Sequence, residues 1–244
     1  MTYEAIPSFM KRDESPGPVK SWSYSAYDNH KKCHYWTFLS KIEKIPTEDS
    51  EAASRGEHMH KAIEDFILGQ VDEFPDAGKH HREVIEKLRD QYNAGLVEVE
   101  GEWAYSLDFA GVTEWRGNDT WLRMKLDAIE FESSDMEAAE VIDWKSGQKY
   151  AIKHTLQGQL YAIGAFIRYP SLQNIKTTFR YLDKANMEPL SNVYTREQAS
   201  IYLPDWIKRG RDITHRHYWP ASPSKQNCRF CDYQKNNTCK YRIK

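Results

Sequence analysis

The stretch VIDWKSGQ, residues 141–148, places an aspartate and a lysine two positions apart at the end of a short apolar run. The run predicts a buried strand, and the glycine after it predicts a turn. Strand side chains alternate between faces, so Asp143 and Lys145 share one face and Ile142 and Trp144 share the other. Charges on a half-buried strand need a compensating partner. The pair is either an ion pair at a strand end or part of a metal site with a lysine beside it.

A second strand with a carboxylate precedes this one, in TWLRMKLDAIEFE, residues 120–132. Alternation puts Asp127 on the polar face together with Arg123, Lys125 and Ile129, and it predicts one apolar face made of Leu122, Met124, Leu126 and Ala128. Asp127 stands 16 positions before Asp143, a gap that a turn between the strands fills. The sequence therefore predicts that both carboxylates and Lys145 converge on one face of a sheet. Carboxylate oxygens are what Mg²⁺ requires, and a lysine there can offset charge on a phosphate.

The order of helical and strand patterns predicts an α/β protein with a mixed sheet that has helices before and after it. Helices are expected at 21–41, 54–69, 78–95, 154–169 and 195–215, and strands at 96–109, 111–115, 120–132, 138–146 and 176–184. Residues 45–53 resemble a linker. After a loose leader at 1–20, we expect one domain over 21–244. Its parts would be a helical part (21–95), a catalytic core (96–220) and a cysteine-rich patch (221–244).

Composition excludes few functions. The chain has 244 residues, of which 40% are hydrophobic and 29% charged, which is typical of a soluble globular protein. No apolar run is long enough for a membrane span, and the N-terminus has no signal-peptide core, so we expect a cytoplasmic protein. The net charge of −2 gives no indication of nucleic acid, so any such contact needs a local basic patch. Lys208, Arg209, Arg211 and Arg216 are either such a patch or a solvated helix face.

Two helices carry polar residues that could join the strand residues. His60 lies at the edge of an apolar stripe formed by Met59, Ile63, Phe66 and Ile67. A lone histidine there is more often a hydrogen-bonded core residue than a metal ligand, and His58 is the alternative. Gln157 and Tyr161 are one helical turn apart, so they either flank a core stripe or point into a site.

Four cysteines suggest metal or redox chemistry in a reducing compartment. Cys228 and Cys231 form a Cys-x-x-Cys pair, Cys239 follows eight positions later, and Cys33 stands alone near the N-terminus. Four thiolates suffice for a [4Fe–4S] cluster or for structural Zn²⁺.

These motifs together resemble the PD-(D/E)XK nuclease superfamily. Its pattern is an Asp on one strand and Asp-x-Lys on the next. Gly56 and His60 resemble the Gly-x-x-x-His helix of RecB-like members, and Gln157 and Tyr161 resemble their Gln-x-x-x-Tyr helix. The resemblance runs in the family's order from Ser23 to Cys239. It implies a restriction-endonuclease-like core.

The resemblance also implies roles. Asp127, Asp143 and His60 would bind Mg²⁺ or Mn²⁺, with the backbone carbonyl of Trp144 as a further ligand. Lys145 would be the catalytic lysine. Gln157 and Tyr161 would position the DNA phosphate or support Lys145. Glu102 is a weaker accessory candidate.

The cysteine arrangement is similar to that of the iron–sulfur nucleases, such as the AddB type and the CRISPR-associated RecB-like exonucleases. In these proteins a [4Fe–4S] cluster joins the two ends of the chain. Cys33, Cys228, Cys231 and Cys239 would be its ligands, with structural Zn²⁺ as the alternative.

The activity implied is hydrolysis of DNA, on single strands or duplex ends, by an exonuclease of phage or mobile-element recombination, repair or degradation. The alternatives are a structure-selective or restriction-like endonuclease and a non-catalytic DNA-binding protein of the same fold. No Walker loop is visible, so the chain would work alone, as an oligomer, or with a separate helicase or recombination partner.

Overall fold

The computed structural model describes residues 15–48 and 50–243, which form two compact units. One unit is Glu48–Ile207, and the other combines Met1–Thr47 with Lys208–Lys244. Most of the predicted leader at 1–20 lies outside the described residues. No helix in the described ranges is long and apolar enough to cross a membrane.

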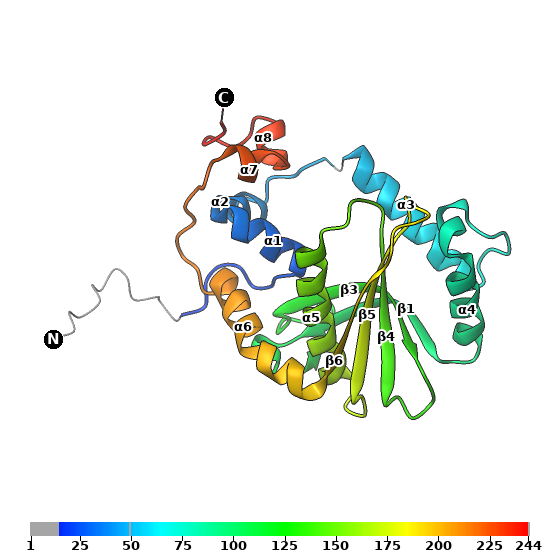
Figure 1. Ribbon diagram of the computed structural model, residues 1–244. Helices are drawn as coiled ribbons and strands as arrows, with labels where there is room; N and C mark the ends of the chain where they lie inside the picture. Colours follow the sequence, from blue (N-terminus) through cyan, green and yellow to red (C-terminus); the bar gives the residue numbers. More distant parts are fainter. Residues whose placement is uncertain (1–14, 49, 244) are drawn as a thin grey trace. The chain divides into compact units, whose positions relative to one another are not determined.

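The larger unit is built on a mixed sheet of six strands in the order β2-β1-β3-β4-β5-β6 (Figure 1). The strands are β1 (Val97–Tyr105), β2 (Val112–Thr113), β3 (Leu122–Phe131), β4 (Ala138–Lys145), β5 (Asn174–Tyr181) and β6 (Leu190–Thr195). Strands β4 and β5 pair in parallel, and the other neighbours pair antiparallel. Helix α5 (Ala151–Arg168) makes the crossover that this parallel pair requires. The predicted α/β class and mixed sheet are confirmed.

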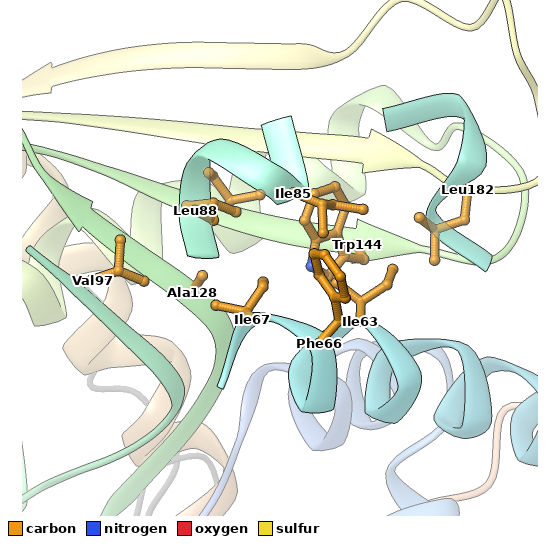
Figure 2. Packing of buried hydrophobic residues seen from close by; sticks show 10 residues of the cluster. Ile63, Phe66, Ile67, Ile85, Leu88, Val97, Ala128, Trp144 and Leu182 are labelled. Carbon is orange, nitrogen blue, oxygen red and sulfur yellow. The ribbon is translucent and has the colours of Figure 1, made fainter. Parts of the chain in front are cut away.

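Two helices cover one face of the sheet, α3 (Glu51–Ile67) and α4 (Arg82–Asn93), the latter preceded by a 3₁₀ turn, η3 (Asp76–His81). Figure 2 shows their apolar side chains against Ala128 and Trp144 of β3 and β4. Ile63, Ile85 and Leu88 are fully buried, and each such side chain contributes roughly 1.5–3 kcal/mol to folding. This cluster fixes the position of α3, and thereby of His60, against the sheet.

Helix α5 lies on the opposite face, where two of its glycines allow close contact with the strands. A Cβ at Gly158 would lie 2.5 Å from the hydroxyl of Thr177, and one at Gly164 would lie 2.0 Å from Met124. The small residues therefore bring α5 near the sheet, and with it the next helical turn, which carries Tyr161.

Strand β3 changes faces at Asp127, contrary to the predicted regular alternation. Met124 lies against α5, whereas Ala128 packs in the cluster under α3 and α4. The ladder with β1 leaves out Asp127 and Glu100, and Glu100 has a positive φ of 53°. That conformation is uncommon for a residue with a Cβ and is found preferentially at functional sites. The prediction that Met124 and Ala128 lie on one face of the sheet was therefore wrong, because a local irregularity of the backbone interrupts the alternation of side chains between the two faces.

The sequence also missed one strand and placed one helix boundary too late. Strand β6 is an edge strand in which Tyr194 alone is fully buried, so it has little apolar pattern. Helix α3 begins at Glu51, inside the predicted linker, because Ser50 caps it by accepting a hydrogen bond from the backbone N–H of Ala53.

The other unit contains short helices from both ends of the chain. They are α1 (Tyr24–Lys32), α2 (His34–Thr37), a π-helical turn η2 (Phe38–Ile42), α7 (Lys225–Cys228) and α8 (Asp232–Lys235), together with the last turns of α6 (Arg196–Thr214). Ser23 caps α1 by accepting a hydrogen bond from the backbone N–H of Ala26. The backbone N–H of Tyr35 donates to the carbonyl of Pro220, and the hydroxyl of Tyr233 donates to the carbonyl of Ile45. The two chain ends are therefore bonded to each other in this unit.

Candidate active site

The two strand carboxylates lie on neighbouring strands where the β3–β4 ladder ends. Ala128 pairs with Ile142, and Asp127 and Asp143 are the next residues along each strand. Both acids belong to rigid strands, so their spacing is fixed by the sheet. The sequence-based prediction that these strands are neighbours is confirmed.

Asp127 joins three elements through its two oxygens. Its Oδ1 lies 2.8 Å from Nδ1 of His60 on α3, and its Oδ2 accepts a 2.6 Å hydrogen bond from the backbone N–H of Trp144. Burial opposes protonation of His60, but the hydrogen bond to Asp127 and the charges of Asp127 and Asp143 outweigh it and raise its pKa. His60 is therefore the histidine that contacts Asp127. His58, two residues earlier on the same helix, is exposed.

Asp143 is held from both sides. Its Oδ2 lies 2.5 Å from Nζ of Lys145, and its Oδ1 accepts a 2.7 Å hydrogen bond from the hydroxyl of Tyr161. The Tyr161 hydroxyl in turn accepts from the side-chain amide of Gln157 at 2.7 Å. Burial and then the charge of Asp143 raise the pKa of Tyr161 well above its usual value, so this hydroxyl keeps its proton and acts as a donor. Gln157 and Tyr161 thus bind Asp143 rather than Lys145.

Lys145 lies between Asp143 and an aromatic ring. Its ammonium is 5.3 Å from the ring centre of Phe179, and about a quarter of the side chain is exposed. Asp143 itself is only 4% exposed. A lysine with one side toward a buried carboxylate and the other toward solvent is placed to meet an anionic substrate.

Gly56 allows α3 to approach the end of β4. A Cβ on this glycine would lie 2.7 Å from Oγ of Ser146, the residue after Lys145. His60 follows one helical turn later on the same helix and meets Asp127. The spacing of Gly56 and His60 therefore has a physical reason: the glycine supplies the close contact that brings the histidine to the strand.

A cleft of about 620 Å³ opens beside these residues. Its lining includes His60, Asp127, Ser146, Glu64, Glu100 and Lys125. Lys125 is ion-paired with Glu100. The sequence analysis missed Glu64, Glu100 and Ser146, although Glu64 follows His60 at i+4 and so could be placed on its face. Glu102, the predicted accessory acid, is exposed and is not part of this lining.

The donor set suits a hard divalent cation. Asp127 contacts His60, Asp143 lies across from Asp127 on the adjacent strand, and one carboxylate oxygen of Asp143 is buried with Lys145 as its charged neighbour. Mg²⁺ and Mn²⁺ are bound in proteins by such carboxylates together with substrate oxygens.

The four cysteines line a single cavity in the other unit, with Tyr35, Trp36 and Tyr233 among its neighbours. None forms a disulfide. The backbone N–H of Ser222 points at Sγ of Cys33 at 3.4 Å, and burial raises the pKa of both Cys231 and Cys239. The isolated Cys33 and the C-terminal trio therefore line one cavity, and their binding of a common metal or cluster stays a prediction.

The basic residues predicted on α6 differ in their surroundings. Arg216 donates to Asp212 at 2.8 Å, and Arg209 lies over the ring of Tyr27. Lys208 and Arg211 are exposed. Contact of this set with DNA stays a prediction.

One protein family and several solved structures are similar to this chain. A sequence profile of the PD-(D/E)XK nuclease superfamily matches residues 21–239. Among solved structures, the protein named SSO0001 has 14% identity and a TM-score of 0.45 over 92% of this chain and 88% of its own. The protein named "Putative exonuclease" from Eubacterium rectale has 11% identity and a TM-score of 0.47 over 98% of this chain and 96% of its own. No curated protein sequence matches. The chain belongs to the PD-(D/E)XK nuclease superfamily.

Proposed function

We propose that this nuclease is a deoxyribonuclease dependent on Mg²⁺ or Mn²⁺, and that it removes nucleotides from DNA ends. The observation that carries the proposal is the position of Asp127, which lines an open cleft, on the strand next to the one that bears the ion pair of Asp143 and Lys145. Two acids and a lysine on rigid strands are the groups that metal-assisted hydrolysis of a phosphodiester needs.

In this proposal Asp127, Asp143 and His60 hold the cation, with the Trp144 carbonyl as a further ligand. The bound cation would lower the pKa of water and draw charge from the phosphate. Lys145 offsets the negative charge that builds on the phosphate oxygens. Tyr161 and Gln157 keep Asp143 in place. The water oxygen forms a bond to phosphorus, one ester P–O bond breaks, and the leaving oxygen takes a proton.

For the cysteine cavity we propose a [4Fe–4S] cluster, with Zn²⁺ as the alternative. All four cysteines line this cavity, and four thiolates suffice for either group. A brown anaerobic preparation supports the cluster, whereas a colourless preparation containing zinc supports the alternative.

Several finer predictions rest on the sequence and on the resemblance rather than on the geometry of the site. They are a phage or mobile-element origin, a role in recombination, repair or degradation, a cytoplasmic location, oligomerisation, and a separate helicase or recombination partner.

The test is digestion of three DNA substrates with Mg²⁺, Mn²⁺, Ca²⁺ or EDTA: end-labelled duplex, end-labelled single strand, and covalently closed circle. The proposal predicts shortening of labelled linear DNA with Mg²⁺ or Mn²⁺, none with EDTA, and an intact circle. Cutting of the circle would replace the exonuclease with an endonuclease. Binding without cleavage under every metal condition would contradict hydrolysis and favour the non-catalytic alternative.

A further inference from the structure

A second group of metal-ligating side chains lies in the unit that contains both chain ends. His30 is near the end of α1, His34 begins α2, and Asp212 is in the last turns of α6. One ligand atom from each lies within 4.8 Å of the other two, and no other His, Cys, Asp or Glu triplet in residues 15–48 and 50–243 meets this condition. We propose that His30, His34 and Asp212 bind a transition-metal ion of the Zn²⁺ class.

The spacing of two of these atoms fits such an ion. Nε2 of His30 lies 3.3 Å from Oδ2 of Asp212. Two ligands of tetrahedral Zn²⁺, with bonds of about 2.0–2.1 Å, are about 3.3–3.4 Å apart. A direct charge-assisted hydrogen bond is usually shorter, at about 2.7–2.9 Å. The distance therefore suits two ligands of one ion better than a strong ion pair.

The atoms that would face away from the ion are already engaged. Nδ1 of His30 lies 2.9 Å from the hydroxyl of Thr37, and Oδ1 of Asp212 accepts a 2.8 Å hydrogen bond from Arg216. Metal-binding histidines and carboxylates are commonly oriented by hydrogen bonds of this kind, because these fix the ring and leave the other atom for the metal.

His34 supplies the observation that most directly needs a ligand. Its ring centre is 4.4 Å from that of His30, and its Nδ1 is buried with no hydrogen-bond partner among the described residues. A buried polar nitrogen without a partner is costly, and native structures rarely leave one. A metal ion shared with His30 would satisfy it.

The donor set selects the class of ion. Mg²⁺ and Ca²⁺ prefer sites made of oxygen atoms, whereas two imidazoles and a carboxylate are typical of Zn²⁺ and its neighbours in the first transition series. The ligands come from α1, α2 and α6, so the ion would join elements that are about 180 residues apart in sequence.

Zn²⁺ binding to the full-length protein tests the proposal. Asp127→Asn and Asp143→Asn are introduced first, so that those carboxylates contribute no binding. The Zn²⁺ affinity is then measured against a chelating dye for this protein, for His34→Gln, for Thr37→Val, and for His80→Gln as a control on an exposed histidine. X-ray absorption at the zinc edge separates nitrogen and oxygen ligands at about 2.0–2.1 Å from cysteine sulfur at about 2.3 Å.

The proposal predicts one Zn²⁺ with nitrogen and oxygen ligands. His34→Gln should weaken this binding at least about 100-fold, Thr37→Val about 10-fold to 100-fold, and His80→Gln should leave it unchanged. A variant could also lose Zn²⁺ because it is less stable, so the melting temperature of each protein is measured with and without Zn²⁺. Zn²⁺ should raise the melting temperature only of proteins that keep the site. Zinc bound only to sulfur, or equal affinity in all four proteins, would overturn the proposal.

Discussion

The acidic site and the cysteine cavity are built in different ways. In the acidic site, Asp127, Asp143 and Lys145 lie on two adjacent strands, and one helix on each face of the sheet supplies the supporting side chains. The cysteines lie on short helices and loops from both ends of the chain. The first arrangement is fixed by backbone pairing and a packed apolar core. The second has little regular structure of its own, so a bound metal would contribute much of its order. We expect changes in the first site to affect chemistry and changes in the second to affect stability.

The largest effect is expected from Lys145→Ala. Loss of one preorganised charge at a site of developing negative charge lowers the rate about 10²–10³-fold. DNA binding should change little, whereas the melting temperature should decrease, because Lys145 is the charged partner of the buried Asp143. Single-turnover cleavage and a DNA-binding assay measure both. Lys79→Ala, which removes an exposed lysine of η3, is the matched control and should cleave normally. Equal loss of activity in both variants would contradict a specific role for Lys145.

A cysteine substitution should show the opposite behaviour. Cys231→Ser removes one of the proposed cluster ligands, so we expect loss of brown colour and a loss of several kcal/mol in the stability of the unit that contains the chain ends. Ser222→Ala, in the same region, keeps all four thiols and should retain the colour. Absorption spectra and thermal melting give the comparison. Full colour and unchanged melting in Cys231→Ser would remove this cysteine from the ligand set.

The buried His154 predicts a pH effect on stability. Burial, helped by the charge of Lys145, lowers its pKa to about 4 from the usual 6.5. The unfolded chain therefore binds a proton that the folded chain does not, and the free energy of unfolding decreases as pH falls from about 6.5 to about 4. The decrease is at most about 3 kcal/mol. Urea unfolding of the wild type and of His154→Gln at several pH values should show a smaller decrease in the variant, whereas His80→Gln should match the wild type. Parallel curves for His154→Gln and wild type would contradict the shift.

A smaller effect is expected from Gly56→Ala. The added Cβ would meet Ser146, and such overpacking costs about 1–3 kcal/mol. It should also displace α3 and weaken the contact between His60 and Asp127, so cleavage should fall at limiting metal and recover partly at high metal. Gly111→Ala has open space around it and serves as the control. If both alanine variants behave alike, the close contact at Gly56 does not position His60.

Sequence periodicity predicted the acidic site because its residues follow regular elements. Asp143 and Lys145 are two positions apart on a strand, and Gln157 and Tyr161 are four apart on a helix, so local geometry placed each pair on one face. The contact of His60 with Asp127 came from the resemblance, since 67 positions separate them.

Other features depend on the backbone or on contacts distant in sequence. The positive φ of Glu100, opposite Asp127 where the ladder between β1 and β3 is interrupted, has no glycine to indicate it. The different surroundings of Met124 and Ala128 have no local sequence signal either. Strand β6 is at the edge of the sheet, and only one of its residues is fully buried, so its sequence carries a weak apolar signal. His30 and His34 lie close to Asp212, which is about 180 residues later in the sequence. Helix or strand periodicity cannot predict contacts between residues so far apart in sequence.

Mn²⁺ binding measured by electron paramagnetic resonance shows whether Asp127 and Asp143 hold one ion, because free Mn²⁺ gives a signal that decreases on binding. We expect one Mn²⁺ site in the wild type that is lost in both Asp127→Asn and Asp143→Asn and kept in Asp72→Asn, a change to a fully exposed carboxylate. Wild-type affinity in either strand variant would show that the two carboxylates do not hold a common ion.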